Sequence, residues 1–141
     1  MALTTKRFVE VHESTSIHRV PHLSSPSFLG LANLRGTLHL CFSISQLLGL
    51  EATIKTLPQS DRHTPQPRLI VIEKDGERWA TPVDRVEGLI RYSQEDIQKA
   101  SVTISNAAST FTFGMLESEK RRIALLDEEL LFYQLKNHLL Q

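Results

Sequence analysis

The chain has 141 residues, enough for one domain with a hydrophobic core or for two very small lobes that share one. Its 16 basic and 16 acidic residues cancel, which argues against a nucleic-acid partner, because such proteins usually carry a net positive field. The single cysteine, Cys41, cannot form an internal disulfide, and no apolar run approaches the roughly 18 residues of a membrane span. Composition therefore predicts a soluble cytoplasmic protein without membrane insertion.

Residues 1–50 read mainly as β structure. RFVEV, at 7–11, has an extended pattern, and a proline-punctuated loop follows at 16–27. The segments GLANL and TLHLCFSI then flank a turn at Arg35-Gly36, which predicts a hairpin. Apolar and polar residues alternate in the second segment, so we expect a half-buried strand with Cys41 on its exposed face.

The second half begins after a segment, 51–67, that contains prolines and few large apolar residues and is expected to be a linker. RLIVIEKD, at 68–75, is rich in β-branched residues and leads into an Asp75-Gly76 turn, a strong hairpin signal. FTFGMLES and RRIALLD predict a further hairpin, and SQEDIQKA, at 93–100, reads as a helical turn or a loop.

Two helices are also expected. Ser45 can cap a short one in QLLG, and Asp127 can cap a longer one in EELLFYQLKNHLL. Leucines at helical spacing share one face of the longer helix, which we expect to pack on the β structure: Leu131, Leu135 and Leu139.

The two halves repeat each other. Gly30 aligns with Gly114, and in each half a hairpin and a leucine-rich helix follow; residues 79–90 align with 1–12. The repeat predicts lobe 1 at about 1–50, a linker at 51–67, and lobe 2 with the C-terminal helix at 68–141. RLIVIEKDGER opens the second copy and has no counterpart in the first. We therefore expect the first lobe to lack its opening strand. Either the natural protein continues upstream and supplies that strand, or a second copy of the chain pairs at the open edge.

The segments "GLANLRG", "RLIVIEKDGERWATPVDRVEGLIR" and "RRIALLDEELLF", in this order, resemble the CheW-like adaptor domains of bacterial chemosensory systems over nearly the whole chain. "LCFSISQLLGL", "RWATPVDRV" and "LLDEELLFYQLKNHL" look most similar to the adaptor of Wsp-type surface-sensing systems. The resemblance implies an all-β fold with a C-terminal helix, built from two packed SH3-like five-stranded barrels. It implies no catalysis and no cofactor.

The resemblance also implies two partners, the cytoplasmic tip of a methyl-accepting chemoreceptor and the regulatory domain of a CheA-type histidine kinase. It places receptor contact in a groove between the lobes, at Glu10 and Arg35. Arg35 could equally be a turn residue that pairs with a nearby carboxylate such as Glu10, and Asn33 reads more readily as a turn-stabilising side chain. Core and interface roles remain open for the apolar residues of this set: Val9, Val11 and Leu31.

Catalytic and metal-binding functions find little support in the residues. His18 and His22 lie in a loop without further ligands at metal-binding spacing. Cys41 and His39 share a strand face, but an inert thiol is the simpler reading, and Asp84 reads as a polar residue that closes a strand. We therefore expect no catalytic, cofactor or metal site. A second hypothesis is that the chain is a fragment of a larger signalling protein, such as a kinase regulatory domain or an adaptor–receiver fusion.

Overall fold

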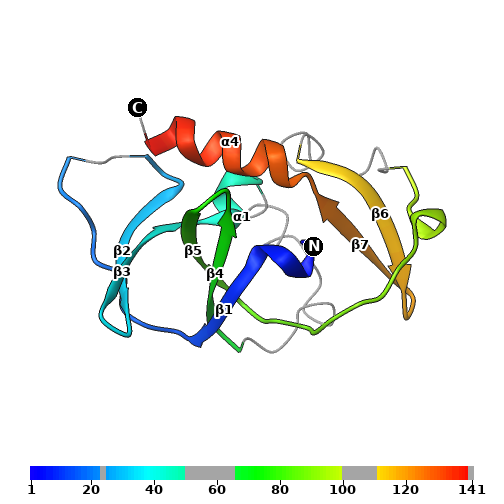
Figure 1. Cartoon of the computed structure of the whole chain (residues 1–141), viewed down its shortest axis with the longest axis horizontal. Coiled ribbons are helices and arrows are strands. Elements are labelled where there is room, and N and C mark those ends of the chain that lie inside the picture. Colours follow the sequence, from blue (N-terminus) through cyan, green and yellow to red (C-terminus); the bar gives the residue numbers. More distant parts are fainter. Residues whose placement is uncertain (23–24, 50–65, 100–110, 140–141) are drawn as a thin grey trace.

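The computed structural model describes residues 1–22, 25–49, 66–99 and 111–139, so residues 51–65 of the expected linker lie outside the described part. The described strands form a five-stranded sheet and a two-stranded sheet, and the C-terminal helix runs along one side of both (Figure 1). The first sheet contains, in sheet order, β1 (Phe8–Glu13), β4 (Arg68–Lys74), β5 (Glu77–Val83), β3 (Thr37–Phe42) and β2 (Phe28–Leu34). The second contains β6 (Thr112–Ser118) and β7 (Arg121–Leu126).

The β4–β5 hairpin lies in the middle of the first sheet and not in the second lobe, where we expected it. β4 pairs antiparallel with β1, and β5 pairs parallel with β3, where Cys41 lies opposite Ala80. The expectation that the first lobe lacks a strand is therefore wrong, because a hairpin from the second repeat completes a five-stranded sheet. The boundary at residue 68 separates the repeats in sequence, but the strands on its two sides share one sheet.

Each repeat also contributes a paired segment to the sheet of the other repeat. Ala2 forms a parallel bridge with Leu125 in β7, and two hydrogen bonds from this bridge measure 2.8 Å and 3.1 Å. In the repeat alignment Ala2 corresponds to Ala80, and Leu125 corresponds to Cys41. The same parallel pairing therefore occurs twice, each time between residues of different repeats.

Two glycines occupy equivalent places in the repeated hairpins. A register shift in the ladder precedes both Gly30 in β2 and Gly114 in β6. Beside each glycine a returning segment makes an isolated antiparallel bridge, His18 with Leu31 and Gln98 with Met115. A Cβ on Gly30 would lie 2.0 Å from the carbonyl oxygen of His18, and its φ is +135°. The glycine is required because the returning backbone passes directly against it.

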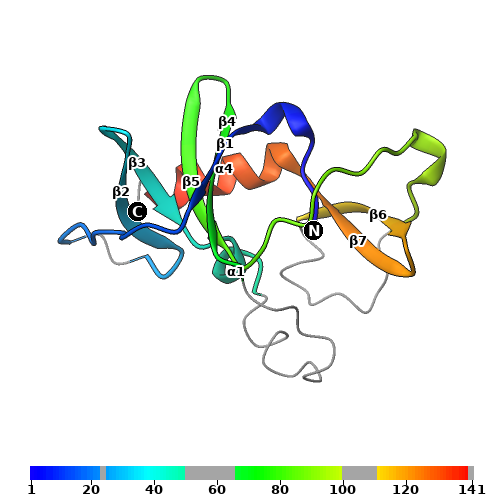
Figure 2. The same ribbon diagram turned by 90° about the horizontal axis from the view of Figure 1, so that it is seen from below.

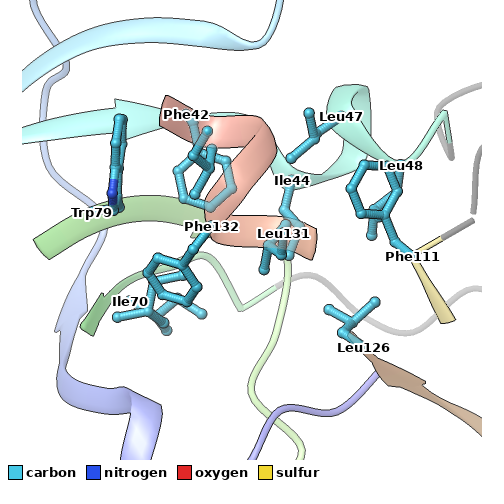
Figure 3. Packing of buried hydrophobic residues seen from close by; sticks show 12 residues of the cluster. Phe42, Ile44, Leu47, Leu48, Ile70, Trp79, Phe111, Leu126, Leu131 and Phe132 are labelled. Carbon is cyan, nitrogen blue, oxygen red and sulfur yellow. The ribbon is translucent and has the colours of Figure 1, made fainter. Parts of the chain in front are cut away.

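The two faces of the first sheet bury separate apolar clusters. The face that carries Cys41, which we call the Cys41 face, buries this cluster: Ala32, Leu34, Cys41, Leu69, Val71 and Ala80. On the opposite face, which we call the helix face, Phe42, Ile70, Ile72 and Trp79 pack against the C-terminal helix (Figure 3). The expected exposure of Cys41 is therefore wrong, since β3 lies inside the sheet and its C-terminal half is covered on both faces.

The C-terminal helix, α4 (Glu128–Leu139), has the cap and the apolar face that the sequence predicted. Asp127 Oδ1 accepts a hydrogen bond from the Leu130 amide at 3.2 Å, and Leu131 and Leu135 are buried in the helix-face cluster. Glu128, in the first turn, accepts hydrogen bonds from the Thr4 amide at 2.9 Å and from Arg7 Nε at 2.6 Å. The start of the chain is thereby attached to the start of the last helix.

Short helices connect the strands. In α1 (Ile44–Leu47) the cap is Ser43 and not Ser45, because Ser43 Oγ accepts from the Gln46 amide at 3.2 Å. η1 (Thr5–Arg7) leads into β1, and η3 (Gln94–Asp96) is the helical turn expected within 93–100. No described helix is long and apolar enough to cross a membrane.

Candidate protein-binding surface

The first sheet distributes the expected binding residues over its two faces. Glu10 lies opposite Val71 and therefore on the Cys41 face. Val11 lies opposite Ile70, and Leu31 lies opposite Leu40, so both belong to the helix face. The strand period of two separates them, since successive side chains point to opposite sides of a sheet.

On the Cys41 face, charged and titratable side chains from both edges of the sheet come together. We call this group the Glu10 cluster, and it consists of Glu10, His12, Arg35 and His39. Glu10 and His12 belong to edge strand β1, where His12 Nε2 contacts the Glu10 carboxylate. His39 is a buried residue of β3, opposite Ala32 of the other edge strand, β2.

The Glu10 carboxylate is stabilised by its neighbours. Its pKa lies below the ordinary value chiefly because of the hydrogen bond with His12, against a smaller opposing effect of burial. The charges of Arg35 and His39 also lower the pKa of Glu10. The charge of Arg35, in the turn between β2 and β3, therefore acts on a carboxylate of the other edge strand, β1.

The turn between β2 and β3 holds the two remaining polar residues of the expected site. Asn33 Oδ1 accepts a hydrogen bond from the Gly36 amide at 2.9 Å, which supports its turn-stabilising role. Arg35 is exposed and has a φ of +53°, and no ion pair joins it directly to Glu10. The guanidinium is thus available at the surface beside an acidic side chain.

Apolar side chains of strands β1 and β3 are also exposed. The exposed fractions are 37% for Val9, 50% for Val11 and 64% for Leu38, whereas Leu31 is half-buried. Val9 and Val11 are therefore surface residues, a point that the sequence left open. Exposed apolar residues bordered by charges are typical of a protein-binding surface.

Sequence reasoning did not assign His12 and His39 to this site. His12 could have been found, because it lies two residues after Glu10 on an extended strand and must share its face. His39 could not, because β3 and β1 are brought into one sheet by long-range pairing with β4 and β5.

The residues considered for catalysis do not form an active site in the described part of the chain. Cys41 is fully buried, its Sγ donates to the His39 carbonyl oxygen at 3.6 Å, and burial raises its pKa to about 11. Asp84 is an exposed residue directly after β5. Among residues 1–22, 25–49, 66–99 and 111–139, no three His, Cys, Asp or Glu side chains are grouped as metal ligands.

Comparison with known proteins identifies the family of the chain. A family model for the CheW-like domain matches residues 1–136. Among solved structures, the chain is similar to the scaffolding protein TtCheW from Thermoanaerobacter tengcongensis, with a TM-score of 0.71 and 22% identity, covering 92% of this chain and 78% of that one. A search of curated proteins gives no match. The chain belongs to the CheW-like domain family, whose members are non-catalytic scaffolds that couple chemoreceptors to the kinase CheA in chemosensory signalling.

Proposed function

We propose that this adaptor contacts the cytoplasmic tip of its chemoreceptor with the end of the first sheet that carries Arg35. The observation that supports this most directly is the exposed Arg35 guanidinium, whose charge acts on the ionised Glu10 carboxylate of edge strand β1. Apolar contacts would supply affinity, and the two opposite charges would fix the orientation of a receptor helix. The cytoplasm is the compartment in which such a contact takes place.

The assignment of Glu10 follows from its electrostatics. A carboxylate with a lowered pKa stays ionised at neutral pH, so it presents a fixed negative charge next to the positive Arg35. Val9 and Val11 on edge strand β1 and Leu31 on edge strand β2 are proposed as the apolar part of the contact, which then includes the edges of the sheet as well as the Cys41 face. Asn33 holds the turn that presents Arg35. The regulatory domain of the kinase would bind elsewhere on the first lobe.

A receptor of the surface-sensing class is our proposal for the partner. Its basis is the sequence resemblance of "LCFSISQLLGL" and "RWATPVDRV" to the adaptor of Wsp-type systems. Binding to cytoplasmic segments of receptors from surface-sensing and chemotaxis systems, measured side by side, would decide between the two classes.

Arg35→Glu tests the receptor contact. Because the side chain is exposed in a turn, the variant should keep its circular dichroism spectrum and its binding to the kinase regulatory domain, but lose capture by the receptor segment. Glu119→Arg is a matched control, since Glu119 holds the equivalent turn position of the second hairpin, with a φ of +50°. Receptor capture by Arg35→Glu at the level of the wild type would show that the contact lies elsewhere.

A further inference from the structure

Strand β1 contains one residue more than the part of β4 with which it pairs. Phe8 lies opposite Ile72 and Glu10 lies opposite Val71, so Val9 is an extra residue between two consecutive pairs. Such a β-bulge bends the strand and changes the direction of nearby side chains, and bulges are frequent beside functional sites. Here the bulge directly precedes Glu10, and the side chain of Val9 is exposed.

The local sequence does not require this bulge. Two further register shifts precede Gly30 and Gly114, where an added Cβ would collide with His18 or with Ile97. Val9, in contrast, is a β-branched residue outside the left-handed region, and such a residue suits a regular strand. We therefore attribute the bulge to the way in which the two ends of β1 are held.

Both ends of β1 are fixed by contacts with other parts of the chain. Before the bulge, Glu128 at the start of α4 accepts hydrogen bonds from the Thr4 amide at 2.9 Å and from Arg7 Nε at 2.6 Å. Figure 2 shows the start of the chain beside β7, followed by η1 and then by β1 at the edge of the first sheet. After the bulge, His12 and Glu13 continue the ladder with β4. The bulge takes up the one residue by which the chain between these anchors exceeds a regular strand.

A regular β1 would require the residues before the bulge to slide by one position, so that Val9 would lie opposite Ile72. The Thr4 amide, which is joined to β1 through the single turn of η1, would then move by about 3.3 Å. Its hydrogen bond of 2.9 Å with Glu128 would not survive a displacement of that size. The contact with Glu128 therefore holds β1 in the bulged register.

We propose that Glu128 is a positioning residue for the receptor contact: by holding the start of the chain, it keeps Val9 bulged out of β1, where a receptor helix reaches it. This inference rests on the proposed function, in which Val9 belongs to the apolar part of the contact. In a bulge two neighbouring residues oppose one residue of the partner strand, so Val9 and Glu10 meet the receptor together. In the regular register Val9 would turn to the helix face beside Ile72, on the opposite face from Glu10.

A disulfide between two introduced cysteines reports the register of β1. In the bulged register Phe8 lies opposite Ile72, and Glu73 points to the other face of the sheet, so cysteines at positions 8 and 73 would not meet. In the regular register these two positions lie directly opposite one another. The chain with Phe8→Cys and Glu73→Cys should therefore oxidise slowly, and adding Glu128→Ala should make it oxidise about tenfold faster. Cys41 does not compete, because it is fully buried.

Binding to a cytoplasmic receptor segment tests the functional part of the proposal. Glu128→Ala should weaken this binding about fivefold, the effect of losing one apolar contact. Its circular dichroism spectrum and its binding to the kinase regulatory domain should be kept. Glu129→Ala is the matched control, since Glu129 lies in the same helical turn but pairs with Lys74 at 3.0 Å. It should change neither the oxidation rate nor the receptor affinity.

Deletion of Val9 separates positioning from stability. The shortened chain keeps every pair between β1 and β4 and the contact with Glu128, but it has no bulge. In that chain Glu128→Ala should still lower the free energy of unfolding, yet it should have no further effect on receptor affinity. A merely structural role of Glu128 would lower the affinity equally with and without Val9.

Two results would overturn the proposal and leave the proposed function standing. One is an oxidation rate that Glu128→Ala does not change. The other is a loss of receptor affinity on Glu128→Ala that is the same in the chain without Val9. Receptor capture that is insensitive to Arg35→Glu would instead overturn the proposed function, and with it the role of Glu128 in binding.

Discussion

Replacing Gly30 by alanine should be among the most damaging small changes to this fold. The new Cβ would lie 2.0 Å from the His18 carbonyl oxygen, whereas real Cβ atoms keep at least 3.0 Å, and the obstacle is backbone that cannot rotate away. The segment around His18 must therefore move outward. That movement disrupts the two hydrogen bonds, each 2.8 Å long, that join His18 to Leu31.

The cost can be worked out from these contacts. Two hydrogen bonds contribute about 0.5–1.5 kcal/mol each. An alanine at a φ of +135° adds about 1–3 kcal/mol of backbone strain. The expected loss of unfolding free energy is about 4 kcal/mol, which for a chain of this size lowers Tm by roughly 10 °C or more.

Two matched changes separate the causes. Gly36→Ala also has a positive φ, +82°, but a Cβ there meets nothing within 4 Å, so it should cost only about 1 kcal/mol. Gly114→Ala has no positive φ and meets the Ile97 Cγ2 atom at 2.5 Å, a side chain that can turn aside, so its cost should be intermediate. Urea denaturation of the three variants measures the order. A Gly30→Ala protein as stable as Gly36→Ala would refute the argument that close backbone approach requires this glycine.

Two further predictions concern titratable groups. Cys41 should resist thiol reagents in the native protein at pH 8 and react at once in denaturant, because it is buried and its pKa is raised to about 11; rapid labelling of the native protein would contradict this. Burial alone would raise the pKa of Glu128, but hydrogen bonds from Thr4 and Arg7 outweigh it, so the pKa is lowered in the folded state. Glu128→Gln should therefore reduce the free energy of unfolding by about 1–3 kcal/mol at pH 7. Denaturant titrations should show this difference between variant and wild type shrinking as pH falls below about 4.3. A difference that is constant down to pH 3 would show that ionisation of Glu128 is not involved.

Local signals in the sequence predicted the local structure well. The Asp75-Gly76 turn and the alternation around Arg35-Gly36 identified both hairpins of the first sheet, and the cap at Asp127 identified the start of α4. Each of these signals acts over a few residues, so composition and spacing suffice to recognise it.

The arrangement of the sheets could not be predicted in the same way. The alignment of Ala80 with Ala2 shows that the two segments are equivalent, but it does not say which hairpin each segment joins. The contact of Cys41 with Ala80 is set by the packing of the whole chain. The burial of Cys41 was missed for the same reason, since alternation along β3 suggested one covered face, whereas separate apolar clusters cover both faces of this sheet.

The candidate site stays a prediction from the sequence resemblance, which named Glu10 and Arg35 together. The charge of Arg35 lowers the pKa of Glu10, but the hydrogen bond with His12 lowers it more. The position of His39 relative to β1 follows from long-range strand pairing, which leaves no trace in a short segment.

The exchange of hairpins has a consequence for how the protein folds during synthesis. When residues 1–49 have emerged from the ribosome, the residues of β1, β2 and β3 are present, but β4 and β5, which lie between β1 and β3 in the sheet, have not yet been synthesised. The hydrogen bonds of Thr4 and Arg7 with Glu128 must wait until nearly the entire chain is available. Such distant contacts have high loop-closure entropy and slow folding. The N-terminal repeat should therefore remain unfolded on the ribosome, and both halves should acquire their native structure together in one late cooperative step.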